Sequence, residues 1–145
     1  MRELPRQLSV DELATLFEGR TRLVERLAET EGPLDRAEEV LAGLGEDEKV
    51  EALKAHPPIG GRRLSARSAR EQGTYDDPAL LTELAYQNQV YEEKFGFRFV
   101  VFVDHRPKSE ILEILRERLQ RTREEELGTG LEELVAIARD RWRTS

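Results

Sequence analysis

The chain has 145 residues, 38% of them hydrophobic and 37% charged, which predicts a single globular domain over residues 1–145 with one buried core. Its net charge of −7 argues against nucleic acid as a partner, because phosphates require a basic surface. The absence of cysteine excludes disulfide and thiolate chemistry, and two histidines are too few for a histidine-rich metal site. No stretch has the pattern of a leader or a membrane span, so we expect a cytoplasmic protein with no membrane partner.

Capping signals and periodic apolar residues predict four helices before residue 58. Ser9 and Glu12 form a capping-box signature in front of the first helix. A short apolar stripe over residues 23–28 predicts the second helix, and Pro33 suits the first position of the third. The fourth helix must end where Pro57 blocks it.

The second half of the chain also carries clear helix starts. Asp77 and Pro78 suit the N-cap and the first position of a long helix. Ser109 opens the next helix, and Thr122 with Glu125 forms a second capping box before the last one. We therefore predict an all-α fold, a single-domain bundle of seven to eight helices.

One segment, residues 97–103, does not have a helical pattern. Its sequence, Phe-Arg-Phe-Val-Val-Phe-Val, is β-branched and aromatic, which taken alone indicates a strand. The rest of the sequence offers no partner for such a strand. We therefore predict an irregular extended segment that runs through the core.

His56 lies in the stretch Ala-His-Pro-Pro-Ile-Gly-Gly, residues 55–61. Because proline bars the preceding residue from helical geometry, His56 should end a helix with an extended backbone. This position suits a catalytic group held in place, and it equally suits an ordinary helix end. The other histidine, His105, lies in a turn-like stretch and is predicted to be at the surface.

Two polar residues fall on buried faces of predicted helices. At about 100° per residue, Arg141 lies beside the core positions of the last helix, whereas Arg139 and Arg143 point away. Its guanidinium either reaches out to water or faces inward as a cation for an anionic or carbonyl ligand, and the sequence leaves both open. For Asn88, which lies in line with buried residues, a structural hydrogen bond is the favoured interpretation.

Residues 65–73 are predicted to form a polar turn near the middle of the chain. Ser68 and Glu71 could form another capping box, but such a box normally precedes an apolar run, and Gly73 ends this turn at once. Because alanine is the only apolar residue in the turn, we interpret it as a pocket wall. Its carboxylate and amide, with the histidine and an inward arginine, would suit proton transfer on a small polar molecule without a cofactor.

Four stretches together carry a family resemblance. They are AHPPIGG at 55–61, SAREQG at 68–73, NQVYEEKFGFRFVVFV at 88–103 and IARDRW at 137–142. In content, order and spacing they resemble the 2-oxo-4-hydroxy-4-carboxy-5-ureidoimidazoline (OHCU) decarboxylases, enzymes that complete the conversion of urate to allantoin. Each stretch alone is weak, but the four in order are specific, and the likeness spans nearly the whole chain.

The resemblance implies an all-helical fold, a homodimer, and decarboxylation of OHCU to (S)-allantoin and carbon dioxide with neither metal nor organic cofactor. It implies that His56 and Glu71 are the catalytic acid/base pair. The residues that it places around the substrate are Pro57, Ser68, Ala69, Arg70, Gln72, Phe99, Val100, Val101, Phe102, Val103 and Arg141. Because imidazole titrates near neutrality, the rate is expected to follow one ionisation between pH ~5 and ~8.

The sequence departs from the family pattern at Pro58 and Gln87, and residues 17–19 are only loosely similar to it. Two alternatives to the decarboxylase stay open at this point. One is a lyase or hydrolase that acts on another ureido compound. The other is a non-catalytic helical interaction module, which would have no evident reason to bury an arginine and a polar turn.

Overall fold

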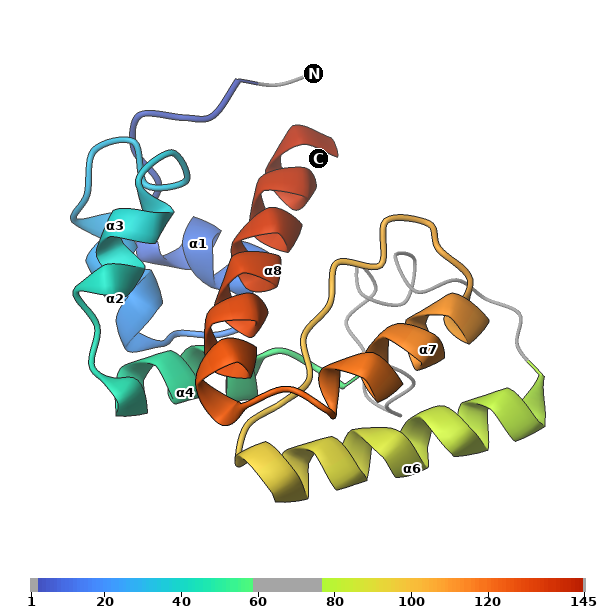
Figure 1. Ribbon diagram of the computed structural model, residues 1–145. Helices are drawn as coiled ribbons and strands as arrows, with labels where there is room; N and C mark the ends of the chain where they lie inside the picture. Colours follow the sequence, from blue (N-terminus) through green and yellow to red (C-terminus); the bar gives the residue numbers. More distant parts are fainter. Residues whose placement is uncertain (1–2, 59–76, 145) are drawn as a thin grey trace.

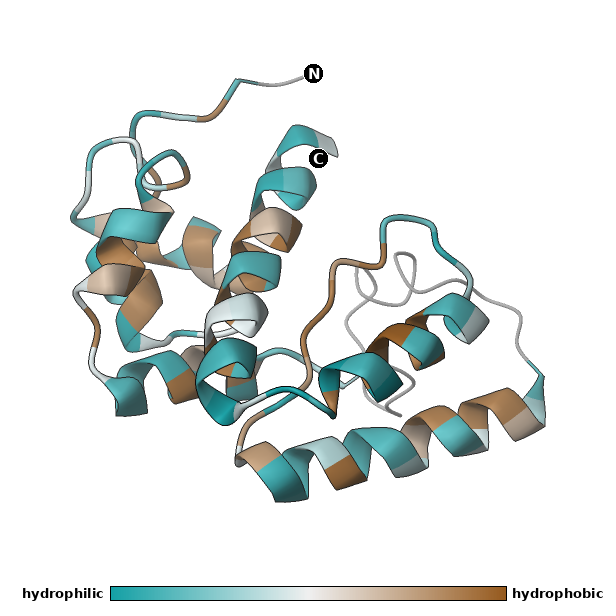
Figure 2. Cartoon of the chain, in the orientation of Figure 1, coloured by the Kyte–Doolittle hydropathy of each residue, from teal (hydrophilic) through white to brown (hydrophobic). Residues whose placement is uncertain are grey.

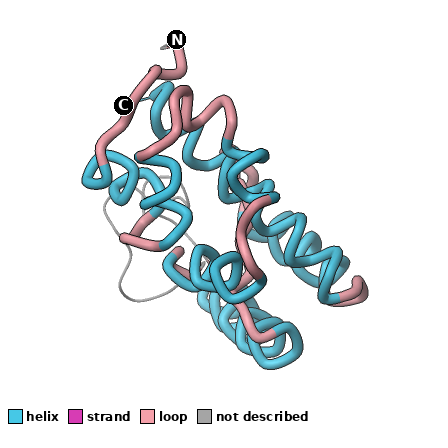
Figure 3. Tube along the Cα trace, turned by 90° about the vertical axis from the view of Figure 1, so that its left-hand side faces the viewer, coloured by secondary structure: helices cyan, strands magenta, loops and turns pink. Residues whose placement is uncertain are grey.

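The computed structural model describes residues 3–58 and 77–144. Within these ranges it holds seven helices and no strand, which confirms the predicted all-α class (Figure 1). The helices are α1 (Val10–Phe17), α2 (Arg22–Ala28), α3 (Ala37–Ala42), α4 (Glu46–Ala55), α6 (Pro78–Phe95), α7 (Lys108–Arg118) and α8 (Arg123–Thr144). Figure 3 shows the loops that join them. None of the helices in these two ranges has the length and apolar character needed to cross a bilayer.

Three of the predicted side-chain caps form, at the starts of α1, α6 and α8. The Ser9 hydroxyl accepts a hydrogen bond from the Glu12 N–H at 3.1 Å, and the Glu12 carboxylate accepts one from the Ser9 N–H at 3.0 Å. Thr122 and Glu125 form the same reciprocal pair at the start of α8, at 3.2 and 3.0 Å. The Asp77 carboxylate caps α6 at 3.0 Å. These bonds satisfy N–H groups that have no partner inside the helix.

The third predicted helix begins later than expected. α3 starts at Ala37 and not at Pro33. The residues between form a turn, closed by a 2.9 Å bond from the Arg36 N–H to the carbonyl of Gly32, whose φ is 64°. The Leu34 carbonyl, which a helix would bond internally, instead accepts a hydrogen bond from an arginine of α8 at 2.8 Å. A contact between distant segments therefore replaces the first helical turn.

α8 organises the packing of the other helices. α1, α3 and α4 each contact α8, α2 contacts α1, α3 and α4, and α6 packs against α7. Figure 1 shows the first group around one flank of α8 and the α6–α7 pair on the other. Where α4 crosses α8, a Cβ on Gly130 would lie 3.2 Å from the side chain of Leu53, so glycine permits the close approach. The end of α4, which carries His56, is thereby held against α8.

Residues 97–103 form an irregular extended segment between α6 and α7, as predicted. The segment is largely apolar (Figure 2), and the buried ring of Phe99 packs against Tyr91 with 5.3 Å between ring centroids. Because no other described segment pairs with it as a strand, its carbonyls bond to side chains. Arg118, for example, donates to the Val100 carbonyl at 2.7 Å. The backbone of the segment is thus fixed by groups of the surrounding helices.

Candidate functional site

His56 ends α4 in the conformation that the following proline imposes. Its backbone is extended, with φ −76° and ψ 136°, and its N–H donates to the Leu53 carbonyl at 3.2 Å. The residue is only 6% exposed. Its Nδ1 atom is buried and forms no hydrogen bond with any described residue. A buried nitrogen with spare hydrogen-bonding capacity is unusual for a purely structural histidine and suits a group that meets a ligand.

Arg141 faces the interior from α8. Its side chain is fully buried, which confirms the inward orientation and excludes the alternative that the guanidinium reaches out to water. Nη1 donates to the Leu16 carbonyl at 2.9 Å and lies 3.2 Å from Oε1 of Glu18. Both partners come from the end of α1. The buried cation is therefore balanced by a carboxylate from a different part of the chain.

The two neighbouring arginines of α8 differ from each other. Arg143 is exposed, as predicted. The prediction for Arg139 is wrong: its side chain is partly buried and donates to the Leu34 carbonyl at 2.8 Å and to Glu38 at 2.7 Å. Helical position alone suggested a solvated face, but the turn before α3 covers this side of α8.

Glu18 is a residue of the site that the sequence analysis missed. It follows α1 with a left-handed backbone, φ 66°, which is uncommon for a residue other than glycine. The next residue, Gly19, has no side chain, and a Cβ there would lie 3.1 Å from that of Ala55, the residue before His56. The glutamate-glycine pair directly after an apolar helix was the available signal. The turn between α1 and α2 thus lies directly against the end of α4.

The charges around His56 favour a neutral imidazole. Burial, together with the positive guanidinium groups of Arg141 and Arg98, lowers the pKa of His56 to about 3. The expectation that His56 titrates between pH ~5 and ~8 is therefore wrong for this environment, because that range belongs to a solvated imidazole. At neutral pH the ring is therefore uncharged, and one of its nitrogen atoms can accept a hydrogen bond.

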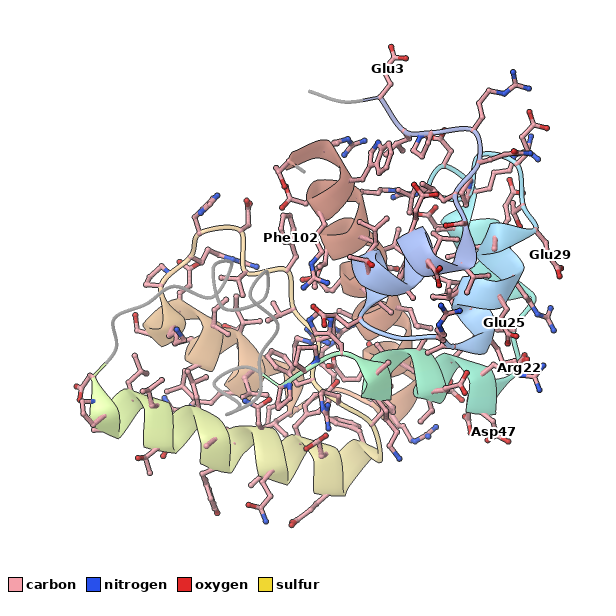
Figure 4. The ribbon with its side chains drawn as sticks, turned by 180° about the vertical axis from the view of Figure 1, so that it is seen from behind. Glu3, Arg22, Glu25, Glu29, Asp47 and Phe102 are labelled. Carbon is pink, nitrogen blue, oxygen red and sulfur yellow. The ribbon has the colours of Figure 1, made fainter. Side chains whose placement is uncertain are left out.

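The backbone of residues 99–103 is partly committed to protein partners. The Phe102 N–H donates to Glu133 of α8 at 3.2 Å, and Figure 4 shows Phe102 on this segment. Arg106 donates to the carbonyls of Phe102 and Val103. The N–H groups of Phe99, Val100, Val101 and Val103 donate to no other described residue, although all four residues are buried. These N–H groups suit contact with a ligand.

The remaining residues that the sequence analysis singled out differ in burial and in hydrogen bonding. Pro57 directly follows the buried imidazole and is itself half-buried. Asn88 is buried, and its Nδ2 donates to the Leu84 carbonyl of its own helix at 2.9 Å, whereas we expected a structural bond to the backbone of a neighbouring segment. His105 is exposed with φ 62°, which confirms its surface position. The predicted residues Ser68, Ala69, Arg70, Glu71 and Gln72 lie outside the described residues.

Acidic and basic groups elsewhere do not make a competing site in the part of the chain that is described. No group of three histidine, aspartate or glutamate side chains there could hold a metal ion. A surface groove of about 630 Å³ between α2 and α3 is lined by Arg22, Glu25 and Glu29, among others (Figure 4). Arg22 lies 3.8 Å from Glu25, so the cations of this groove stand beside carboxylates and favour neither sign of ligand.

Comparison with known proteins gives a consistent family. The family model for OHCU decarboxylase matches residues 2–143. A uric acid degradation bifunctional protein from Bacillus sp. (strain TB-90) is 30% identical over 105 residues, which cover 69% of this chain and 21% of that protein. The OHCU decarboxylase of Halalkalicoccus jeotgali is 28% identical over 114 residues, which cover 72% of this chain and 65% of that protein. The chain thus spans less than two thirds of the length of these two relatives.

The fold is also found among solved structures. A crystal structure of OHCU decarboxylase in the presence of (S)-allantoin superimposes with a TM-score of 0.75 at 24% sequence identity. The match covers 90% of this chain and 94% of that one. At this level of identity the likeness shows a shared fold.

Proposed function

Since this chain belongs to the OHCU decarboxylase family, we propose that it converts OHCU to (S)-allantoin and carbon dioxide, the last step from urate to allantoin. The observation that carries the proposal is the buried His56 imidazole at the end of α4, within the electrostatic influence of the buried Arg141 of α8. A neutral base and a fixed cation suit a reaction in which a hydroxyl loses its proton while negative charge develops on a ring.

The reaction requires one bond cleavage and three proton movements. The substrate carries a carboxylate and a hydroxyl on one ring carbon, next to an imine carbon that bears the ureido group. When the bond to the carboxylate breaks, carbon dioxide leaves, the electron pair forms a double bond to the imine carbon, and the imine nitrogen takes up a proton from solvent. The hydroxyl then loses its proton to become a carbonyl, and the neighbouring carbon gains a proton. Protonation from one face gives a single enantiomer of allantoin.

The site residues divide these tasks in the proposal. His56 engages the hydroxyl or the carboxylate, and Glu71 orients the imidazole or the substrate. Arg141, held by Glu18 and the Leu16 carbonyl, stabilises the charge that develops on the ring oxygen. The ring edge and the ureido arm are held by a further set of groups: Pro57, Ser68, Ala69, Arg70, Gln72 and the backbone of Phe99, Val100, Val101, Phe102 and Val103.

An assay with the unstable substrate tests this function. Purified, metal-stripped protein is mixed with freshly generated urate-oxidation intermediate, and the reaction is followed by ultraviolet absorbance, carbon dioxide release and circular dichroism. We expect faster decay than in buffer and one enantiomer of allantoin. Racemic allantoin formed at the uncatalysed rate would refute the function. Activity lost with a chelator and regained with a divalent metal would refute the cofactor-free mechanism.

We also propose that the protein is a cytoplasmic homodimer, as the family resemblance and the composition suggest. Leu81 and Tyr86 are large apolar side chains that lie exposed on α6, with 36% and 60% of their surface accessible, and such groups suit coverage by a second copy. Sedimentation velocity at micromolar concentration should give a dimer. A monomer under these conditions would remove this part of the proposal.

A further inference from the structure

Arg98 connects the irregular core segment to the residue proposed as the base. Its Nη1 donates to the His56 carbonyl at 2.7 Å and to the Lys54 carbonyl at 3.3 Å. Its Nε donates to Oε1 of Glu92 on α6 at 2.9 Å. One guanidinium therefore joins the end of α4, the 97–103 segment and α6.

These bonds restrain the backbone on both sides of the His56 side chain. The N–H of His56 is bonded to the Leu53 carbonyl at 3.2 Å, which restrains φ, and its carbonyl is bonded to Arg98, which restrains ψ. The following residue, Pro57, has no N–H to contribute. Nδ1 of His56 bonds to no described residue. Among the described residues, the orientation of the ring is therefore set by the restrained His56 backbone and by packing.

Only an arginine can make this set of contacts at once. Its donors are fixed in one plane, so a single side chain can bind a carboxylate through Nε and a carbonyl through Nη1. A lysine ammonium carries the same charge but has no rigid fork. The side chain of Arg98 is 25% exposed, so its bonds are partly shielded from water. The carbonyls that it binds belong to the end of a helix, where they lack helical partners.

We propose that Arg98 is a positioning residue, which holds the His56 peptide so that the imidazole meets the substrate in one orientation. The inference deepens the proposed decarboxylation and rests on it. Arg98 acts through His56 and contacts no reacting atom in this scheme. It is separate from Arg141, which reaches the site from α8 and is held by Glu18.

The charged groups that face His56 lie on several elements. Arg141 comes from α8 with Glu18 after α1, and Arg98 comes from the core segment with Glu92 of α6. Both guanidinium groups disfavour an imidazolium ion at His56. Removal of the Arg98 charge should therefore raise the pKa of His56, whereas a lysine at this position should largely preserve it.

The experiment compares Arg98→Lys and Arg98→Gln with a matched control, Arg123→Lys. Arg123 makes the same kind of contacts far from His56: Nε donates to the last carbonyl of α6, that of Phe95, at 2.9 Å, and Nη1 to Glu46 at 2.8 Å. We expect both Arg98 variants to lower kcat by about 10- to 100-fold, the range found for residues that orient metal-binding histidines, with KM nearly unchanged. Arg123→Lys should keep the kcat of the parent. Thermal unfolding of each variant checks that the fold persists.

A second measurement does not depend on turnover. The chain has two histidines, so the imidazole signals of His56 and His105 can be assigned with His105→Asn and followed by NMR against pH. The signals of His56 should shift in both Arg98 variants, its pKa should rise in Arg98→Gln alone, and Arg123→Lys should match the parent. If the parent does not decarboxylate OHCU, the proposed function fails and the NMR result still decides the positioning role. Parent-like His56 signals in Arg98→Lys, or equal losses of kcat in Arg98→Lys and Arg123→Lys, would overturn the inference.

Discussion

Two buried arginines, Arg141 and Arg118, make the same kinds of bond but differ in their roles. Arg141 binds a carbonyl and lies 3.2 Å from the carboxylate of Glu18, while Arg118 binds the Val100 carbonyl and Glu126, both at 2.7 Å. The difference lies in the carboxylates. Glu126 is completely buried, whereas the side chain of Glu18 is 15% exposed on a left-handed residue.

The Glu126 carboxylate accepts further hydrogen bonds. The Tyr91 hydroxyl donates to Oε1 of Glu126 at 2.6 Å, and Arg121 donates to Oε2 at 2.8 Å. Burial and the hydrogen bond to the Glu126 carboxylate raise the pKa of Tyr91. The phenol therefore keeps its proton and donates it to this hydrogen bond. Arg118 also lies 4.6 Å from the centre of the Phe99 ring. This network commits the Glu126 carboxylate to the fold, although Nη2 of Arg118 is buried and bonds to no described residue. Arg141 differs because its charge acts on the buried imidazole of His56, whose Nδ1 bonds to no described residue either. Neither a buried charge nor one unbonded donor identifies a site by itself; the imidazole near Arg141 makes the difference.

The largest expected effect is on activity at His56. His56→Asn should lower kcat by about 10²- to 10⁴-fold, the usual contribution of a general acid or base, because the amide cannot take up the proton. The fold should persist, since the bonds from His56 to Leu53 and Arg98 are made by its backbone. Steady-state kinetics with His105→Asn as the exposed control test this. Equal losses in the two variants would show that His56 has no special role.

Among these changes, loss of the hydrogen bonds around Glu126 should lower stability most. Glu126→Ala should lower the free energy of unfolding by about 3–5 kcal/mol, because it leaves Arg118 buried without its carboxylate. Glu18→Ala should cost less, since its side chain is partly exposed and water can replace part of the lost contact. Urea unfolding of both variants measures the difference. If Glu18→Ala proved as destabilising as Glu126→Ala, the two pairs would be structurally equivalent.

Substitutions of Arg141 test whether this buried arginine, unlike Arg118, contributes to activity. Arg141→Ala should lose about 2–4 kcal/mol of transition-state stabilisation in kcat/KM, the scale for a single preorganised donor. Arg141→Lys should also lower turnover strongly, because an ammonium does not replace the planar fork.

Arg143→Ala is the matched control for Arg141, since Arg143 is exposed on the same helix and should stay within a few-fold of the parent. Arg139→Ala is not a suitable control, because the Arg139 side chain of the parent bonds to Leu34 and Glu38. Small and equal effects at Arg141 and Arg143 would mean that the buried cation is structural, like Arg118.

A pH dependence of stability is also expected, and it develops gradually over several pH units. The pKa of His56 is about 3 in the folded protein and near the ordinary 6.5 in the unfolded chain. The unfolded chain therefore binds the proton first, and stability falls as the pH drops from 6.5 toward 3, by about 1.4 kcal/mol for each pH unit. Unfolding of the parent and of His56→Asn at several pH values isolates this contribution. The same slope in both proteins would show that His56 is solvated in the folded state.

Local signals in the sequence were enough to predict the helices and the orientation of several side chains. The capping boxes at Ser9 and Thr122 form as predicted, because each needs only residues within one helical turn. Helical periodicity, which is a property of one helix, placed Arg141 beside the core positions of α8, and the structure decided between its two open orientations in favour of the buried one. The extended backbone of His56 followed from the proline beside it.

Tertiary structure alone decided which groups meet. Glu18 pairs with Arg141, and Arg98 reaches the His56 carbonyl, across intervals that carry no periodic signal. The turn before α3 and the burial of Arg139 were mispredicted for the same reason, since one contact between distant segments produces both. The pKa of His56 likewise depends on burial and on two cations from other elements. Residues close in sequence fix local conformation, but the partners of a buried charge are chosen by the packing of helices that are far apart in the chain.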